Sequence, residues 1–166
     1  MRQVTIEGGR FPSWYPDGKQ IAFLSDRQGL CKFWSIASVG GGEKSLFALD
    51  GAEMPRLSPD ARQFAFNITR DGIINVATVP VTDGEPKQLT YEKEMAGVPC
   101  WSPDGQLLAL EIKRGDDTHI AVVPSKGGAP TQLTFKRGQS WPYSWSPDGD
   151  KILFAGARDE VSKAAS

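Results

Sequence analysis

The side chains that carry catalytic chemistry are few in this sequence, and their spacing does not suit it. His119 is the only histidine, so any histidine-based triad would depend on this one residue. Its position inside a repeated strand pattern favours a packed role over catalysis. Neither a Gly-x-Ser-x-Gly nucleophile elbow nor a Gly-rich phosphate loop occurs in the chain. We therefore predict no catalytic residue and no cofactor-binding residue.

The residues that could bind a metal are also poorly arranged. Asp116-Asp117 and Asp148-Gly149-Asp150 could contact a cation, but calcium takes about six or more oxygen ligands, and turn chemistry explains both pairs better. Cys31 and Cys100 are 69 residues apart and lack CxxC spacing, so they indicate neither a zinc site nor a disulfide scaffold. We predict no metal site and expect both cysteines to act as small buried hydrophobic residues.

Charge and hydropathy exclude two further classes of protein. The 19 basic and 20 acidic residues leave a net charge of −1, which argues against the basic surface that nucleic-acid binding requires. No stretch approaches the roughly 18 apolar residues of a membrane span, and residues 1–9 contain no apolar export segment. We expect no membrane span, and a location that is periplasmic if a leader has been removed and cytoplasmic otherwise.

A repeat organises most of the remaining sequence. The dipeptide Pro-Asp recurs four times, at separations of 43, 44 and 44 residues. Ser-Pro-Asp-Gly is typical of a type I turn, because each residue suits its position in that turn. The second copy departs from the pattern, with Leu57 and Ala61 in place of Trp and Gly. The residues that we assign to this structural repeat are Trp14, Asp17, Asp60, Trp101, Asp104, Trp145 and Asp148.

Each copy continues in the same way. An apolar strand follows the Pro-Asp turn, and then a polar turn has an Arg ten residues after the repeat Asp. Three copies add a third strand, a Gly-containing turn and a short fourth strand. Four strands in about 44 residues is the period of a propeller blade. We predict an all-β fold, a β-propeller of four-stranded antiparallel blades with about three complete blades and partial terminal blades.

We expect one propeller domain over residues 1–166. Its repeats cover approximately 11–49, 54–90, 97–134 and 141–166, with 2–6 as an outer strand of a preceding or closing blade. Propellers usually close by pairing a terminal strand into the last blade. Three ways of closure stay open: the chain is a fragment of a longer propeller, copies complete each other's blades as a homo-oligomer, or the N-terminal strand closes a four-bladed ring.

The repeat also resembles a known family. The Trp-Ser-Pro-Asp-Gly turns at 101–105 and 145–149, with Gly-Gly-x-Pro-x-Gln-Leu-Thr at 127–134, are similar to the WD-like repeat of TolB-like β-propellers. The family includes periplasmic envelope proteins, propellers of prolyl-oligopeptidase-like hydrolases, and sensor regions of bacterial regulators. The resemblance implies a non-catalytic bacterial scaffold that binds a protein or peptide on its loop-rich face or at the channel mouth. The alternatives are part of a hydrolase propeller and a sensor region.

Antiparallel blades separate their loops onto two faces. The Pro-Asp and Gly-containing turns share one face, while the Arg-bearing turns and the blade-to-blade loops share the other, which we call the loop face. Function more often lies on loops of varied composition, and Arg and Trp are favoured interface anchors. The partner-binding residues that we predict are Arg27, Arg70, Arg114, Arg158, Glu53, Glu92 and Trp141. The alternative is that the arginines only solvate turns and pair with nearby acidic residues.

The tryptophans give one more expectation from the repeat. Trp14, Trp101 and Trp145 each precede a repeat Asp by three residues, so we expect all three to pack between blades. Trp141 falls outside this phase and inside a predicted loop, so we expect it to be exposed on the loop face.

Overall fold

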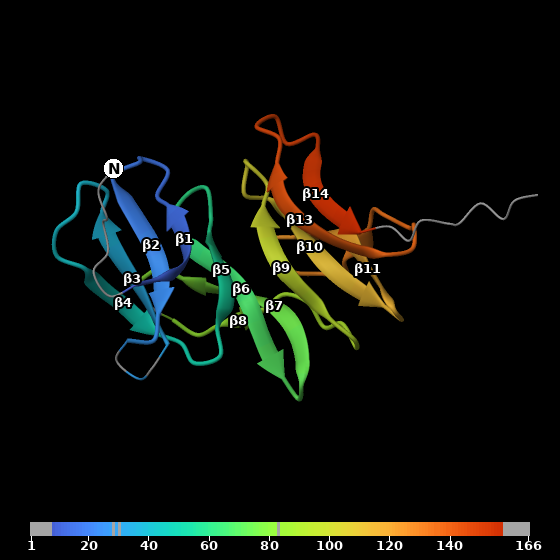
Figure 1. Ribbon diagram of the computed structural model, residues 1–166, viewed down its shortest axis with the longest axis horizontal. Coiled ribbons are helices and arrows are strands. Elements are labelled where there is room, and N and C mark those ends of the chain that lie inside the picture. The colour runs from blue at the N-terminus through green and yellow to red at the C-terminus, as the bar shows by residue number, and fades with distance from the viewer. Residues whose placement is uncertain (1–7, 28, 30, 83, 158–166) are drawn as a thin grey trace, which may run out of the picture.

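Four antiparallel sheets form the computed structural model, which describes residues 8–27, 29, 31–82 and 84–157 (Figure 1). The first sheet contains β1 (Arg10–Trp14), β2 (Gln20–Ser25), β3 (Lys32–Ala37) and β4 (Lys44–Ala48). The second contains β5 (Glu53–Leu57), β6 (Gln63–Arg70), β7 (Ile73–Pro80) and β8 (Lys87–Gln88). The third contains β9 (Ala96–Trp101), β10 (Leu107–Arg114), β11 (Asp117–Pro124) and β12 (Thr131–Gln132). The fourth is the pair β13 (Gln139–Trp145) and β14 (Ile152–Ala157).

This arrangement confirms the all-β prediction with four-stranded antiparallel sheets, because the described residues form three such sheets and no helix. Each of these three sheets pairs its strands in chain order. The repeat boundaries themselves stay a prediction. The predicted outer strand at 2–6, Arg158 and the continuation of the last repeat lie outside the described residues.

In all four Pro-Asp turns, one backbone amide donates to the carbonyl three residues before it, and another donates to the repeat Asp carboxylate. A serine hydroxyl also donates to the repeat Asp in the three copies that contain Ser58, Ser102 and Ser146. In the third copy, the Gly105 amide donates to the Ser102 carbonyl at 2.9 Å, which closes a β-turn. The Asp104 carboxylate accepts from the Gln106 amide at 3.0 Å and from the Ser102 hydroxyl at 2.6 Å. A short Asp side chain can bond the backbone two residues on, which explains why the repeat needs Asp at this position. The repeat Asp is therefore a structural residue.

The second copy contains a strained residue at the end of this turn. Gly18, Gly105 and Gly149 have φ angles of 66°, 68° and 79°, and Ala61 occupies the same position with a φ of 57°. A side chain in this left-handed region costs roughly 1–2 kcal/mol, while glycine adds about 0.5–1 kcal/mol of unfolded-state freedom. We therefore expect Ala61→Gly to raise the free energy of unfolding by up to about 1 kcal/mol. Urea unfolding measures this change.

The matched variant Gly105→Ala should lower the free energy of unfolding, because it places a Cβ at a position with a φ of 68°. If neither Ala61→Gly nor Gly105→Ala changed the free energy of unfolding, the backbone strain inferred at this turn position would be contradicted.

Apolar side chains fill the spaces between consecutive sheets. Between the first and second sheets, Phe33 stacks on Phe47 at a centroid distance of 4.7 Å and packs at a tilt against Phe64 at 4.6 Å. Between the second and third sheets, Leu108 and Leu110 pack with residues of the second sheet and are fully buried. Alternate residues of an inner strand thus face opposite neighbours, as the period of two requires. The second sheet therefore packs against both the first and the third.

Candidate functional site

The loops separate onto two faces, as antiparallel pairing requires (Figure 1). The β6–β7 turn, the loop before β9 and the β10–β11 turn lie on one side, which is the loop face. The β5–β6 and β9–β10 turns, which contain Pro-Asp, lie on the opposite side. The strands therefore hold the predicted partner-binding loops together on one face.

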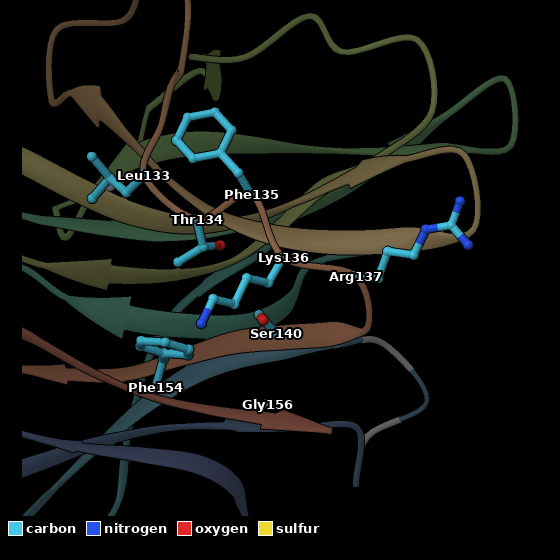
Figure 2. A pocket seen from close by; sticks show the side chains of 8 residues that line it. All are labelled: Leu133, Thr134, Phe135, Lys136, Arg137, Ser140, Phe154 and Gly156. Atoms are coloured by element: carbon cyan, nitrogen blue, oxygen red, sulfur yellow. The ribbon is translucent and has the colours of Figure 1, made fainter. Parts of the chain in front are cut away.

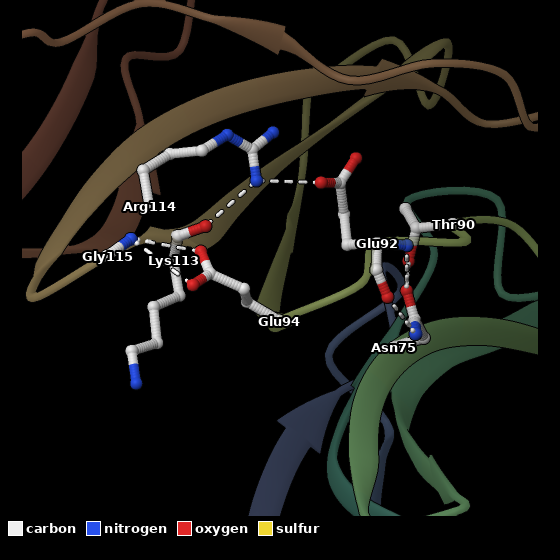
Figure 3. A network of polar contacts seen from close by, with 7 residues as sticks. All are labelled: Asn75, Thr90, Glu92, Glu94, Lys113, Arg114 and Gly115. Carbon is white, nitrogen blue, oxygen red and sulfur yellow. Dashed lines mark hydrogen bonds and ion pairs between the residues drawn. The ribbon is translucent and has the colours of Figure 1, made fainter.

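Hydrogen bonds fix the loop that joins the second sheet to the third (Figure 3). The side-chain oxygen Oδ1 of Asn75 accepts from the Thr90 hydroxyl and from the Glu92 amide, both at 2.8 Å. At the other end of the loop, the Glu94 carboxylate accepts from the Gly115 amide at 3.0 and 3.3 Å. The loop is thus attached to β7 at one end and to the β10–β11 turn at the other, so hydrogen bonds fix its backbone at both ends.

Two of the predicted partner-binding residues pair with each other in this network. Arg114 Nη1 lies 2.7 Å from Glu92 Oε2, and the two side chains are 40% and 18% exposed. The same nitrogen donates to the Lys113 carbonyl at 2.8 Å (Figure 3). Partly exposed ion pairs contribute only about 0–1 kcal/mol to stability. This pair therefore orders the loop face without making a large contribution to the fold.

Two other predicted residues remain accessible. Arg70, at the end of β6, and Glu53, at the start of β5, are exposed. Neither forms an ion pair with any residue that the structure describes. Arg70 is therefore an exposed cation at the tip of the β6–β7 hairpin, on the same face as the loop that precedes β9.

The prediction for Arg27 is wrong, because its side chain is buried rather than presented. Arg27 forms an ion pair with Glu43, and the guanidinium lies 3.8 Å from the ring centroid of Trp34. Only 10% of the Arg27 side chain is exposed. A guanidinium packed on an aromatic face gains cation–π energy, which explains this burial. Arg27 therefore supports the first sheet and is not a surface anchor.

The prediction for Trp141 is also wrong. Trp141 lies within β13 rather than in a loop, where it pairs with Ala155 of β14 and is half-buried. Its indole Nε1 donates to the Tyr143 hydroxyl at 3.2 Å. β13 begins at Gln139, two residues before the predicted start of the last repeat at 141, so Trp141 lies in the β13–β14 hairpin.

Whether a repeat tryptophan packs between sheets depends on the presence of a sheet before its own. The indole Nε1 of Trp101 donates to the Arg56 carbonyl at 3.0 Å, and that of Trp145 donates to the Cys100 carbonyl at 2.9 Å. Both therefore bridge to the preceding sheet, as expected. Trp14 is 62% exposed, so the expectation that it packs between blades is wrong. It stands on β1, the first strand that the structure describes, and has no preceding sheet there to pack against.

Sequence reasoning missed two exposed aromatic residues. Tyr91 and Phe135 follow the two Gln-Leu-Thr segments and are both 76% exposed. The segments have equivalent hydrogen bonds: the hydroxyls of Thr90 and Thr134 each accept a backbone amide of the third strand at 2.9 Å. The same repeat position thus presents an aromatic ring twice. Its 44-residue spacing was the signal that could have found it.

A few titratable groups have pKa shifts with local causes. Serine hydrogen bonds hold the pKa values of Asp60, Asp104 and Asp148 below the usual range for aspartate. Burial raises the pKa of the Cys100 thiol, and its Sγ lies 3.5 Å from the Tyr143 carbonyl. The repeat carboxylates are therefore held as ionised turn acceptors, while the thiol is held in its less nucleophilic protonated form.

The other side chains that could act in catalysis or bind a metal are buried or do not form a cluster. His119 lies in β11 opposite Ile112 and is 6% exposed, which agrees with the expected packed role. Burial raises the pKa of the Glu111 carboxyl, although a hydrogen bond with Thr118 lowers it. Within the described part of the chain, no group of three His, Cys, Asp or Glu side chains could hold a metal. No helix within it is long and apolar enough to cross a membrane.

Comparison with known proteins gives one family and several similar folds. A family model described as the TolB beta propeller domain matches residues 49–165. The crystal structure of TolB from Acinetobacter baumannii has a TM-score of 0.76 and 22% identity, over 92% of this chain and 39% of that chain. No curated protein matches the chain.

Two propellers of hydrolases are also similar. Puromycin hydrolase has a TM-score of 0.69 and 16% identity, over 95% of this chain and 27% of that chain. The β-propeller domain of the Trilobed protease from Pyrococcus furiosus has a TM-score of 0.59 and 16% identity, over 92% of this chain and 51% of that chain. The chain thus spans less than two thirds of each of these structures. These likenesses confirm the predicted β-propeller fold.

Proposed function

This chain belongs to the TolB beta propeller domain family, and on that premise we propose that it is a non-catalytic scaffold that binds a protein or peptide through its loop face. The observation that carries the proposal is the pair of equivalent aromatic residues, Tyr91 and Phe135, each 76% exposed on an ordered loop. Large exposed aromatic side chains are costly in water and favourable at interfaces.

The loop face also supplies the polar groups that such an interface needs. Arg70 is exposed on the same face as the loop that contains Tyr91, and arginine and tyrosine are the residue types enriched among interface anchors. The hydrogen bonds of Asn75 and Glu94 fix the backbone of this loop before a partner arrives. A preorganised loop loses less conformational entropy on binding, which favours affinity.

We propose no catalytic role because the Cys100 thiol and the His119 imidazole are poorly suited to one. The pKa of the Cys100 thiol is raised, and His119 is packed in β11. Both are therefore poorly suited to nucleophilic catalysis, which needs an activated nucleophile beside an accessible base.

Capture of the partner from a lysate of the source cells tests the proposal. We expect the double variant Arg70→Ala, Tyr91→Ala to lose a protein that the wild type captures, because it removes one cation and one aromatic ring from the loop face. The matched control is Val39→Ala, Lys126→Ala, which removes one exposed apolar residue and one exposed cation from the turns of the opposite face. Quantitative mass spectrometry compares the three samples.

Equal recovery of every captured protein by the two double variants would contradict the assignment of the loop face. Recovery that falls only with the Val39 and Lys126 variant would place the interface on the Pro-Asp face instead.

A second candidate function follows from the similar propellers of puromycin hydrolase and the Trilobed protease. In this alternative, the chain is part of a hydrolase propeller whose catalytic residues lie in other sequence. The coding sequence around the chain distinguishes the two: a Gly-x-Ser-x-Gly elbow followed by Asp and His would support the hydrolase. Similarity of the fold alone does not decide between them, because this fold serves many activities.

A further inference from the structure

A cavity of about 370 Å³ lies between the first and second sheets, on the face that carries the Pro-Asp turns. Each of these two sheets has four strands, so the cavity lies between complete sheets. The larger cavity in Figure 2, of about 560 Å³, lies instead beside β14, with Phe154 on one side and the segment from Leu133 to Arg137 on the other. The smaller cavity is therefore a feature of the interior of the repeat array, away from its last sheet.

Five of the described side chains that line this cavity are polar. None of the five forms a side-chain hydrogen bond or an ion pair with a described residue, and they are Tyr15, Gln20, Ser35, Lys44 and Thr82. Ser35 is only 4% exposed, and a buried hydroxyl that lacks a partner is unfavourable. A ligand atom that pairs with this hydroxyl would therefore be stabilised in the cavity.

The Ser35 hydroxyl and the Lys44 ammonium start from neighbouring positions. Ser35 of β3 and Lys44 of β4 are direct partners in the antiparallel pairing of these strands. Directly opposed residues have their side chains on the same face, with Cβ atoms roughly 4.5–5.5 Å apart. One ligand group can therefore reach both side chains.

The next repeat uses the equivalent lysine in a different way. Lys44 and Lys87 each follow a repeat Asp by 27 residues. Lys87 Nζ donates to the Lys126 carbonyl at 3.0 Å, which ties the outer strand of the second sheet to a turn of the third. Lys44 has no such bond to Thr82, which is the residue equivalent to Lys126. The Lys44 ammonium is thus available to a ligand.

The leucine two residues after each lysine shows the same contrast. Leu89 is 1% exposed, and Gly127 lies so close that a Cβ there would be 3.5 Å from the Leu89 carbonyl oxygen. Leu46 is only partly buried and lines the cavity. The fold therefore closes this site between the second and third sheets and leaves it open between the first and second.

The lining also determines the chemistry of a ligand. Lys44 is the one charged side chain among the described residues that line the cavity. Burial and the nearby Asp17 carboxylate raise the pKa of the Tyr15 phenol, so this hydroxyl stays protonated and can donate. Leu46 and Val81 supply apolar contact. One cation, neutral donors and an apolar wall suit a ligand with one negative charge and an apolar body.

We propose that this cavity is a binding site for a small organic carboxylate with an apolar body. The carboxylate accepts from the Lys44 ammonium and the Ser35 hydroxyl, and the apolar body lies against Leu46 and Val81. The volume of about 370 Å³ is near the lower end of the roughly 300–1,000 Å³ that ligand sites span, which favours a free acid with few heavy atoms.

This site goes beyond the proposed function and does not depend on it. It lies on the face opposite the loop face and shares no residue with the proposed interface of Arg70 and Tyr91. The variant Arg70→Ala, Tyr91→Ala should therefore leave binding of the acid unchanged, so failure of one proposal is distinguishable from failure of the other.

Titration of the isotope-labelled full chain with free acids tests the site. The probes are phenylacetate and isocaproate, each with its uncharged primary amide as the matched control. Two-dimensional NMR should show saturable shifts of the backbone amide signals of Ser35, Lys44 and Thr82, with a dissociation constant of about 1 mM or lower for the acids. The uncharged amides should bind about tenfold more weakly, because they cannot form an ion pair with Lys44.

Variants of the lining residues test the two polar contacts. Lys44→Met should weaken binding of both acids by about tenfold, whereas Lys44→Arg, which keeps the charge, should retain it. Ser35→Ala should weaken binding by about threefold or more. The matched control is Lys87→Met, which removes the equivalent lysine of the closed site and should bind the acids as the wild type does.

Four results would overturn the inference. They are the absence of saturable shifts with either acid, equal affinity for the acids and their amides, equal losses for Lys44→Met and Lys87→Met, and tighter binding of the tripeptide Gly-Gly-Leu than of isocaproate. The last result would assign the cavity to the carboxylate end of a peptide chain rather than to a free acid.

Discussion

Trp101→Ala should lower the free energy of unfolding by about 3–5 kcal/mol, whereas Trp14→Ala should change it by less than about 0.5 kcal/mol. The two residues occupy the same position in the repeat, but Trp101 is 8% exposed and Trp14 is 62% exposed. Trp101 packs in the core between the second and third sheets, and its indole donates to the Arg56 carbonyl at 3.0 Å. Its removal leaves both a cavity and an unpaired carbonyl.

Urea unfolding followed by far-ultraviolet circular dichroism measures both variants without relying on tryptophan emission. Similar losses for Trp101→Ala and Trp14→Ala would contradict the difference in burial between the two sites. The contrast matters because it shows that the contribution of a repeat residue depends on the neighbouring sheet as well as on the motif.

Phe33→Ala should be similarly damaging, with a loss of about 3–5 kcal/mol in the free energy of unfolding. Phe33 has no exposed surface, and its ring lies 4.7 and 4.6 Å from the centroids of Phe47 and Phe64. These rings come from the first and second sheets, so one substitution weakens the contact that holds the two sheets together.

The matched control for this prediction is Phe135→Ala, which removes the same side chain from a position that is 76% exposed. It should change the free energy of unfolding by less than about 0.5 kcal/mol in the same urea experiment. A smaller loss for Phe33→Ala than for Phe135→Ala would mean that the core between these sheets is packed differently.

The strands and turns could be predicted from the sequence because their causes are local. The Ser-Pro-Asp-Gly turn is closed by bonds within five residues, such as that from the Gly105 amide to the Ser102 carbonyl. The apolar strands that follow alternate between two cores, and the 44-residue period repeats this pattern. Local chemistry and periodicity together were sufficient for the fold.

Burial could not be predicted in the same way, because it depends on the neighbouring sheets. Trp14 matches the motif, but no sheet that the structure describes precedes it. Arg27 matches the repeated arginine turns, but the ring of Trp34, which has no counterpart at that place in the other copies, draws its guanidinium inward. The repeat determines where a residue lies along a blade, whereas the neighbouring blades determine how exposed it is.

The candidate site was predicted in part for the same reason. Alternation of loops placed Glu92 and Arg114 on one face, where they form an ion pair. The exposed rings of Tyr91 and Phe135 were missed because the prediction for the loop face was built on charged residues and Trp141. Comparing equivalent positions between copies would have identified them.

The central claim is that a partner protein binds the loop face. Site-specific photocrosslinking tests it most directly, with the photoreactive residue p-benzoylphenylalanine placed either at Tyr91 on the loop face or at Val39 on the opposite face. Both positions are more than two thirds exposed, so the two proteins differ chiefly in the face that is probed. We predict a specific covalent adduct with a partner protein from position 91 and none from position 39. An adduct formed only from position 39, or equally from both positions, would contradict the claim.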